Sequence, residues 1–206
     1  MVDLSASLSS GLQALAIKSN SKQKEQLLSL LEQLLKWNKA YNLTAITDPK
    51  EALTLHLLDS LAVMPFIKQK NIIDVGTGAG FPGLPLAIML PDVQFTLLDS
   101  NNKKIRFIHQ QIHLLGLTNA TAVHSRVEDY RFQFDAVISR AFASLADMIT
   151  ITSHLLADSG RWLAMKGQYS KQEVVDLANI VDQVAYYPLD VPGLSAERCL
   201  VELKPK

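Results

Sequence analysis

The sequence predicts an α/β protein built on a mainly parallel, seven-stranded sheet with an antiparallel edge strand, preceded by a helical extension. The sheet is predicted from residues 67–206, where short apolar runs alternate with helical stretches, as is typical of parallel strands covered on both faces. The antiparallel edge is predicted because only DVPGLSAE separates the last two apolar runs, which suits a hairpin. The extension is predicted from residues 1–66, which contain no convincing strand.

The composition fits a globular protein and excludes several other classes. Hydrophobic residues make up 48% of the 206 residues and charged residues 19%, and 20 basic side chains balance 20 acidic ones, so net charge indicates no partner. The single cysteine, Cys199, excludes a disulfide framework and a cysteine-rich zinc site, and the five histidines show no metal-ligand spacing. No apolar run reaches the roughly 20 residues that span a bilayer. The N-terminus lacks a basic signal region, so we expect a cytoplasmic protein without a metal.

Two helices are predicted in the extension. Residues 21–41 carry leucines at helical spacing on one face and charged side chains on the other, and Asn20 with Gln23 forms a capping-box pattern at the start. The pair Asp48-Pro49 breaks the chain, and a second helix follows over about residues 50–66.

The predicted strands of the sheet are short and almost entirely apolar. They are residues 71–75, 94–98, 120–124, 134–139, 161–165, 183–189 and 198–203. The predicted helices between them are residues 83–90, 102–115, 144–157 and 171–180.

A glycine loop, Gly76-Thr77-Gly78-Ala79-Gly80, follows the first predicted strand. Ligands of open α/β sheets bind beyond the carboxyl ends of the strands, so this loop is a candidate binding site, and a tight turn is the alternative. A dinucleotide fingerprint needs its third glycine where Phe81 stands here. Asp74 would repel a pyrophosphate and would suit a cationic ligand such as the amino group of S-adenosylmethionine. The pattern D-x-G-x-G-x-G resembles the first motif of class I methyltransferases.

Two further strand ends contribute candidate residues. Asp99 ends the second strand, where a carboxylate can accept hydrogen bonds from both ribose hydroxyls of NAD or of S-adenosylmethionine; capping of the next helix is the alternative. Val127 and Glu128 follow the third strand, at the place where an adenine lies in this kind of fold.

With these residues in place, the chain resembles the bacterial ribosomal RNA small subunit methyltransferase G family, also called glucose-inhibited division protein B. The resemblance rests on KWNKAYNLTAITDP, HLLDSL, DVGTGAGFPGLPLA, LLDSNNKK, SRVED, VISRAFASL and MKGQ, which together cover almost the whole chain. Ala79 and Phe81 are small departures from relatives that carry Pro and Leu there. The resemblance implies a Rossmann-like class I fold and methyl transfer from S-adenosylmethionine to N7 of one guanine in 16S ribosomal RNA. The implied partner is that RNA or a small-subunit assembly particle, and we expect a monomer that binds no membrane and no metal.

The resemblance also assigns binding residues position by position. Gly76 would let the backbone approach the methionine part, Phe81 would form an apolar wall, and Val127 with Glu128 would hold the adenine. Asp99 is added on geometry for the ribose. The expected cofactor-binding residues are therefore Gly76, Gly78, Phe81, Asp99, Val127, Glu128 and Arg140.

Arg140, directly after the fourth strand, is the catalytic candidate, in a positioning role. Its neighbourhood, Ser139-Arg140-Ala141-Phe142, lacks the [D/N]-P-P-[Y/F] element that amino-group methylases commonly carry there. Methylation of a pyrimidine carbon needs a cysteine nucleophile, and Cys199 lies in an apolar run that predicts a buried structural thiol. Guanine N7 has a free lone pair, so its methylation needs no general base and depends on orientation. A salt bridge at the strand end is the alternative role of Arg140.

RNA contacts are predicted at Lys166, Arg140 and Phe142, which share the strand-end rim, and Phe142 could stack on a base or form an apolar wall. Lys103, Lys104 and Arg106 fit an ordinary solvated face better than a binding surface. His56 and Asp59 stand one helical turn apart and suit a structural role, bonding each other or a loop.

Four functional readings follow from the sequence. The first is an RNA guanine-N7 methyltransferase, and its rival among enzymes is a methyltransferase for another RNA or for a small molecule. A nicotinamide-binding oxidoreductase or regulator is disfavoured by Phe81 and Asp74. The last is a non-catalytic RNA-binding protein that retains an old cofactor pocket.

Overall fold

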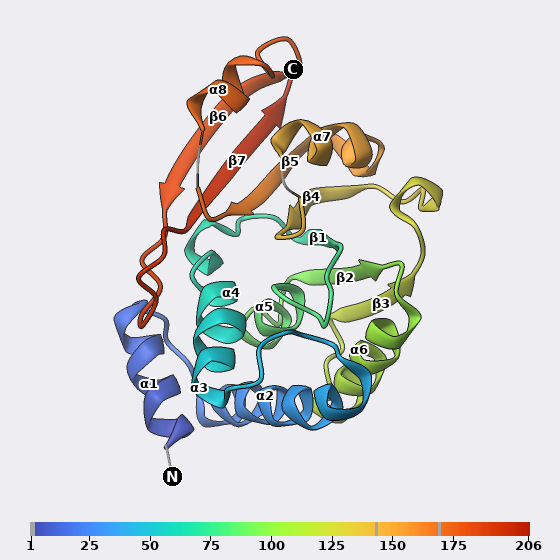
Figure 1. Cartoon of the computed structure of the whole chain (residues 1–206). Coiled ribbons are helices and arrows are strands. Elements are labelled where there is room, and N and C mark those ends of the chain that lie inside the picture. The colour runs from blue at the N-terminus through green and yellow to red at the C-terminus, as the bar shows by residue number, and fades with distance from the viewer. Residues whose placement is uncertain (1–2, 143, 169) are drawn as a thin grey trace.

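The computed structural model describes residues 3–142, 144–168 and 170–206, and in these a single seven-stranded sheet organises the fold (Figure 1). The strand order is β3-β2-β1-β4-β5-β7-β6. The strands are β1 (Asn71–Val75), β2 (Gln94–Asp99), β3 (Ala120–His124), β4 (Phe134–Ser139), β5 (Leu156–Lys166), β6 (Val181–Pro188) and β7 (Cys199–Pro205). The pairs β3-β2, β2-β1, β1-β4 and β4-β5 are parallel, so the predicted α/β sheet is confirmed.

The antiparallel strand lies one place inside the edge. The strand β7 pairs antiparallel with β5 on one side and with β6 on the other, so β6 forms the edge and runs in the direction of β5. The expected hairpin is therefore correct, but its position is corrected: the second strand of the hairpin inserts between the first strand and the sheet. The apolar faces of β7 explain this placement, because all residues over 199–203 are buried, as a strand with two neighbours requires.

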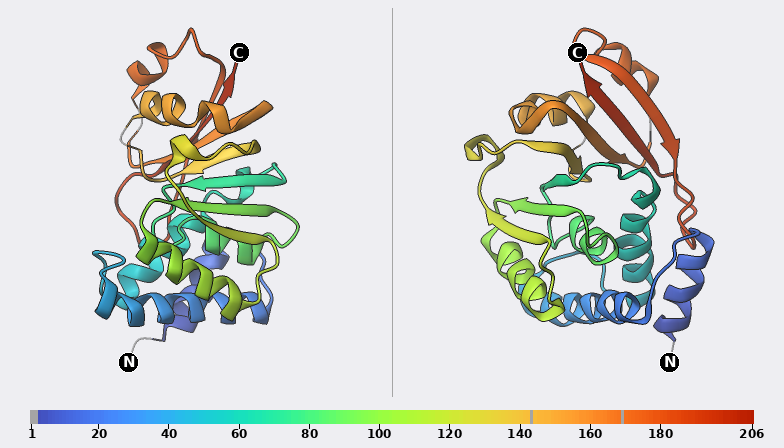
Figure 2. Two further views of the ribbon diagram at one scale, coloured as in Figure 1. Left: turned by 90° about the vertical axis from the view of Figure 1, so that its right-hand side faces the viewer. Right: turned by 180° about the vertical axis from the view of Figure 1, so that it is seen from behind.

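Helices cover both faces of the sheet, as the two turned views show (Figure 2). Alternate strand residues enter opposite cores: Ile72 and Leu163 belong to the larger cluster, and Ile73 and Trp162 to the smaller. The larger cluster includes residues of α5 (Gly83–Met89) and α6 (Asn102–Leu115), and the smaller includes residues of α7 (Leu145–Thr152).

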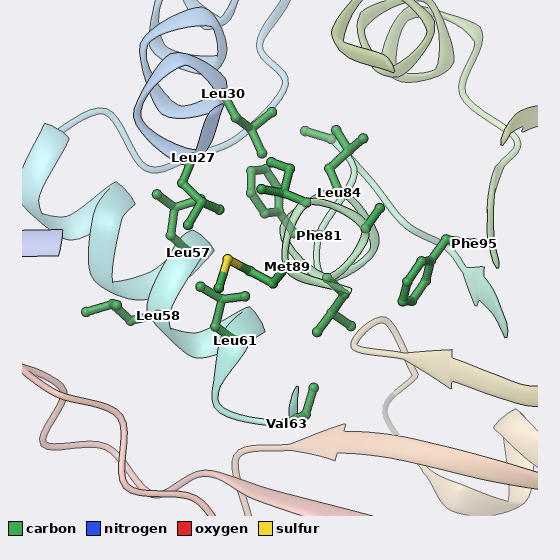
Figure 3. Close-up of a cluster of buried hydrophobic side chains, with 14 of the residues drawn as sticks. Leu27, Leu30, Leu57, Leu58, Leu61, Val63, Phe81, Leu84, Met89 and Phe95 are labelled. Atoms are coloured by element: carbon green, nitrogen blue, oxygen red, sulfur yellow. The ribbon is translucent and has the colours of Figure 1, made fainter. Parts of the chain in front are cut away.

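The N-terminal helices pack onto the outside of α5 and α6. Helix α2 (Ser21–Tyr41) has the predicted bounds and the predicted capping box, in which Asn20 accepts from the backbone N–H of Gln23. Figure 3 shows its residues Leu27 and Leu30 in the same apolar cluster as Phe81. The amide of Gln23 also donates to the carbonyls of Ile88 and Met89 at the end of α5. Because one core spans the extension and the sheet, the division at residue 66 stays a prediction about chain organisation.

The remaining elements differ from prediction in detail. Helix α1 (Leu4–Ala14), within the extension, was not predicted separately. The second helix of the extension is a continuous run of short segments, α3 (Pro49–Ala52), the π-helical η1 (Leu53–Leu58) and α4 (Asp59–Leu61), followed by η2 (Met64–Phe66). Helix α8 is confined to Lys171–Val175, and 3₁₀ turns η3 (Val127–Asp129) and η4 (Ser153–Leu155) complete the chain.

Strand β5 begins earlier than expected and replaces the end of a predicted helix. Leu156 pairs with Phe134, and the register shifts before Ala136, so β5 contains an irregularity. The segment Asp158-Ser159-Gly160 resembles a turn in sequence, but Gly160 packs so closely that an added Cβ would lie 3.1 Å from the Phe134 carbonyl oxygen. The glycine therefore permits a bulged strand rather than ending it.

Candidate functional site

The glycine loop is held in shape by the end of the neighbouring strand. The backbone N–H groups of Gly76 and Thr77 both donate to the Leu98 carbonyl, at 2.9 and 3.1 Å. Gly76, Gly78 and Gly80 have φ values of +67°, +63° and +92°, a region that side chains with a Cβ rarely adopt. The three alternating glycines are therefore required by the backbone conformation of the loop itself.

Asp74 lies beneath the loop and not beside a ligand. Its carboxyl is fully buried, where Oδ2 accepts from the Thr77 hydroxyl at 2.6 Å and from the Gly83 N–H at 2.9 Å. Burial raises the pKa of Asp74 to about 6, against the opposing effect of these hydrogen bonds. It lines none of the cavities described below. The expectation of a carboxylate facing a cationic ligand is thus wrong, because two donors of the loop turn Asp74 inward.

Gly83 is a residue that the sequence analysis missed. An added Cβ there would lie 2.5 Å from the Leu97 side chain and 2.9 Å from Asp74 Oδ2. The absence of a side chain lets the start of α5 pack closely on β2, the role that a dinucleotide fingerprint gives to its third glycine. The sequence does contain this third glycine, but two positions after Phe81, the place where the fingerprint requires it.

The first cavity of the site, the strand-end cavity, lies beyond β1, β2 and β3. It has a volume of about 280 Å³ and is lined by Gly76, Asp99, Val127, Glu128 and Phe142, among others. The carboxyl of Asp99 accepts from the backbone N–H of Gly78 at 2.9 Å and of Asn101 at 2.8 Å. Asn101, not Asp99, caps α6. Four of the predicted cofactor-binding residues therefore meet at one cavity.

The second cavity, the loop cavity, adjoins the first on the other side of the glycine loop. Its volume is about 160 Å³, and Gly76, Gly78, Phe81, His56 and Arg140 line it. The two cavities share Gly76 and Ala141 in their linings. An elongated ligand with a polar end and an aromatic end would thus extend across Gly76, which has no side chain to obstruct it.

The third and largest cavity, of about 660 Å³, lies beyond β4, β5 and β7. Lys166, Arg140 and Phe142, the three predicted RNA contacts, all line this large cavity. It shares His56 and Arg140 with the loop cavity and Phe142 with the strand-end cavity. The three cavities therefore meet along residues 140–142, each of which lines two of them.

Asp59 from α4 joins two arginines at this meeting point. Its side chain is 2% exposed; Oδ2 accepts from Arg140 Nη1 at 2.6 Å and Oδ1 from Arg198 Nε at 3.0 Å. The same Arg140 nitrogen donates to the Leu55 carbonyl at 2.8 Å. The salt bridge weighed as the alternative role of Arg140 exists, and it connects the extension to the rim of the cavity.

His56 does not bond Asp59, as the alternative for this pair allowed, but takes part in a separate contact. Its Nε2 lies 2.9 Å from the Thr44 hydroxyl, and its ring stacks on Phe81 with centroids 4.8 Å apart. Burial, assisted by the charge of Arg140, lowers the pKa of His56 to about 4, so the ring is neutral at physiological pH. His56 therefore forms an uncharged wall between the loop cavity and the large cavity.

Lys166 and Cys199 lie opposite each other in the β5–β7 pairing. The Lys166 ammonium contacts both carboxylate oxygens of Glu173, at 2.8 and 3.0 Å. Burial raises the pKa of the Cys199 thiol, which is 1% exposed. A thiol with a raised pKa is a poor nucleophile, which supports the structural role predicted for it.

The basic segment at the start of α6 lies on the outer side of the glycine loop. Lys103 and Arg106 are exposed, and Lys104 is half-buried. The Lys104 ammonium lies 3.9 Å from the position that a Cβ on Gly78 would take, so one cation of this segment reaches the loop.

The described residues contain no group of three side chains suited to a metal ion, and no described helix is long and apolar enough to cross a membrane. The fit of the cavities to S-adenosylmethionine rests on Gly78 and Asp99. A Cβ on Gly78 would meet nothing nearer than Lys104, so the loop offers an open backbone cradle beside the Asp99 carboxyl.

Comparison with known proteins agrees with this geometry. A family model described as "GidB: rRNA small subunit methyltransferase G" matches residues 23–201. A protein named "Ribosomal RNA small subunit methyltransferase G" from Aeromonas salmonicida is 55% identical over 184 residues, covering 88% of each chain. One of the same name from Alteromonas mediterranea is 47% identical over 206 residues, covering 99% of this chain and 98% of the relative.

Among solved structures, a SAM-dependent methyltransferase from Aquifex aeolicus shares the fold, with a TM-score of 0.56 and 19% sequence identity over 76% of this chain and 93% of that one. The fold class is therefore that of class I methyltransferases, as predicted. The extent of the family match and the identity to its members together show that the chain belongs to the rRNA small subunit methyltransferase G family.

Proposed function

We propose that this chain transfers a methyl group from S-adenosylmethionine to N7 of one guanine in 16S ribosomal RNA. The observation that carries the proposal is the meeting of three cavities along residues 140–142, two of them beside the glycine loop and one large enough for a nucleotide. Membership of a family named for small-subunit ribosomal RNA methylation supports the choice of acceptor. We further propose a cytoplasmic protein acting on this RNA or on an assembly particle; a monomeric state stays a prediction.

The cofactor-side residues would bind and orient. Gly76 and Gly78 would present backbone without a side chain to the cofactor, Asp99 would accept from the ribose hydroxyls, and Val127 with Glu128 would border the adenine. Phe81, stacked on His56, supplies an apolar wall on the methionine side. Bound S-adenosylmethionine supplies an activated methyl group on a sulfonium centre.

The acceptor-side residues have no proton to remove. Guanine N7 attacks through its own lone pair, so the chain needs no general base, and the pKa of His56, lowered to about 4, makes that ring a weak one. Arg140 then acts by position, because it lines both the loop cavity and the large cavity and is fixed by Asp59 and Leu55. Holding the reactants in line can supply roughly 7–11 kcal/mol of barrier reduction.

The test is transfer of a labelled methyl group from S-adenosylmethionine to unmodified 16S ribosomal RNA and to small-subunit particles, followed by mapping of the modified nucleotide. We expect 7-methylguanosine at one position. Label on an amino group or a ring carbon, or transfer only to small molecules, would contradict the proposal. Tight NAD binding without S-adenosylmethionine binding would instead favour the oxidoreductase.

A further inference from the structure

Apolar, cationic and acidic side chains line the large cavity, and Asp59 and Glu173 are the acidic ones. Ile46, Leu55 and Met165 give it apolar surfaces, and Arg140 and Arg198 bring guanidinium groups to it. These residues come from the loop before α3, from η1, and from the ends of β4, β5 and β7, which are remote in sequence. The cavity is therefore assembled only in the folded chain, and no single motif indicates it.

Asp59 is an unusual residue for stability alone. A carboxylate that is 2% exposed has lost its hydration, and its pairing with Arg140 and Arg198 has to offset that cost. Apolar residues of similar size are often at least as stabilising in such a position. The ion pairs instead fix the orientation of the Arg140 and Arg198 side chains, which otherwise have many rotamers.

The orientation leaves donors for a ligand. A guanidinium carries five N–H groups in a rigid planar fork. Arg140 uses Nη1 for Asp59 and Leu55, and Arg198 uses Nε for Asp59 and Nη1 for the Glu197 carbonyl. In the part of the chain that the structure describes, no hydrogen bond engages the Nη2 group of either arginine. Both side chains line the large cavity, so each can offer a donor there.

A guanine nucleotide matches this arrangement. Its flat ring suits apolar walls, and its O6 and phosphate oxygens are acceptors for guanidinium donors, a common pairing for guanine. N7 must remain unbonded to attack the methyl group, so the donors serve O6 or phosphate. The large cavity shares Arg140 and His56 with the loop cavity, and a base within it could therefore face the cofactor. Enzymes that modify a base take it out of its stack into such a pocket.

We propose that the large cavity receives the unstacked target guanine, and that Asp59 is a positioning residue that aims the Arg140 and Arg198 guanidiniums at it. The inference rests on the proposed function. It adds the place of the acceptor base and a role for the Asp59 carboxylate, which lines this cavity but is 2% exposed and has both oxygens bonded to arginines.

The test is Asp59→Asn, which keeps the size of the side chain and removes its charge. We expect kcat on unmodified 16S ribosomal RNA to fall about 10- to 100-fold, since misplacement of an orienting group by about 1 Å has effects of this size. S-adenosylmethionine affinity, measured by calorimetry, should fall by a smaller factor than kcat, because Asp59 lines neither cofactor-side cavity and only one of its two arginines, Arg140, does. Asp59→Glu should recover part of kcat.

The matched control is Glu202→Gln. Glu202 is also buried and pairs with an arginine, Arg161, but it lines none of the three cavities. The Glu202→Gln protein should be less stable than the wild type and keep its kcat. If Asp59→Asn does not fold, Arg198→Lys, which keeps a charge beside Asp59 and loses the fork, should lower kcat or raise the KM for RNA several-fold.

Two results would overturn the inference, and they are distinguishable from failure of the proposed function. Full kcat in folded Asp59→Asn would remove the positioning role while wild-type activity stood. Equal losses in Asp59→Asn and Glu202→Gln would reduce Asp59 to a structural ion pair. A wild-type protein that methylates no guanine in the RNA would overturn the proposed function and this inference with it.

Discussion

The two sides of the site are built in different ways. The cofactor side depends on one continuous segment, residues 74–83, whose backbone conformation, close packing and hydrogen bonds form the glycine loop. The acceptor side depends on side chains from segments far apart, joined by ion pairs such as that of Asp59 with Arg198, which are 139 positions apart. The first is a matter of local conformation, and the second of long-range assembly.

This difference predicts which kind of substitution should affect each side of the site. An added Cβ would clash at Gly76, Gly80 and Gly83, so these positions of the glycine loop should respond to side-chain size. Ion pairs orient side chains without filling space. Function of the large cavity should therefore depend on the charge of the paired groups and on the planar shape of the arginine guanidiniums. Substitutions that separate size from charge therefore test whether the two sides are as distinct as their construction indicates.

The largest effect is expected for Gly76→Val. Gly76 has φ of +67°, and an added Cβ would lie 2.9 Å from Ala141 Cβ, so strain and overlap add. We expect at least about 100-fold weaker S-adenosylmethionine binding by calorimetry. Gly116→Val is the matched control: its φ is +63° but its Cβ would meet nothing within 4 Å. Equal cofactor affinity in a folded Gly76→Val protein would refute the size argument.

Arg140→Lys should affect the acceptor side more than the cofactor side, although Arg140 lines both the large cavity and the loop cavity. The lysine keeps a charge for Asp59 but has one nitrogen where the guanidinium presents a fork. We expect turnover to fall about 10-fold, and more than the change in unfolding free energy explains. Arg161→Lys, in the ion pair with Glu202 away from the cavities, should leave turnover unchanged. A fully active Arg140→Lys enzyme would show that fork geometry is not needed.

One buried titratable group on each side should give opposite responses to pH. The pKa of His56 is lowered from 6.5 to about 4, so its contribution to stability is complete above pH 6.5 and is lost as the pH falls through 4. The pKa of Asp74 is raised from 3.8 to about 6, so its contribution is complete below pH 3.8 and is lost as the pH rises through 6. Between pH 6.5 and 4 the two largely cancel.

Single substitutions should expose that cancellation. Relative to the wild type, His56→Gln should resist acid better and Asp74→Asn worse, each by roughly 2–3 kcal/mol in unfolding free energy between pH 6.5 and 4. Urea unfolding at both pH values measures it. Parallel profiles for the two variants would mean that these groups titrate normally in the folded protein.

The smallest effect is expected for Lys166→Gln. Lys166 lines the large cavity, and its pairing with Glu173 already satisfies part of its charge. We expect only a few-fold increase in the KM for RNA and a salt dependence reduced by about one ion. Arg106→Gln, on the exposed face of α6, is the control and should change neither. If Arg106→Gln raised the KM for RNA and Lys166→Gln did not, the RNA-binding surface would lie on the α6 side.

The sequence predicted most of the fold because its local signals agree. Helix α2 and strands β1, β3 and β4 have the predicted bounds, since capping, apolar runs and glycine punctuation all point the same way. The failures have specific causes. Gly160 permits a bulge within β5, which begins at Leu156, inside the helix expected over residues 144–157. The insertion of β7 beside β5 depends on pairing that no local pattern encodes.

The residues of the candidate site also fall into those that local sequence signals predicted and those that they did not. The cofactor-side residues, from Gly76 to Glu128, lie where motif spacing put them, and their roles stay predictions. Asp74 was misplaced because sequence spacing cannot tell which way a side chain turns. The ion pairs of Asp59 were missed because Arg140 and Arg198 lie 81 and 139 positions away from it.

The position of β7 has a consequence for the order of folding. This strand follows β6 in the chain, yet it fills the place between β5 and β6, and Arg198 immediately precedes it. A nascent chain that ends before Arg198 already contains the whole glycine loop but lacks one arm of the acceptor cavity. It also lacks Leu200, Val201 and Leu203, which are fully buried, so one segment completes both the acceptor cavity and the core of the sheet.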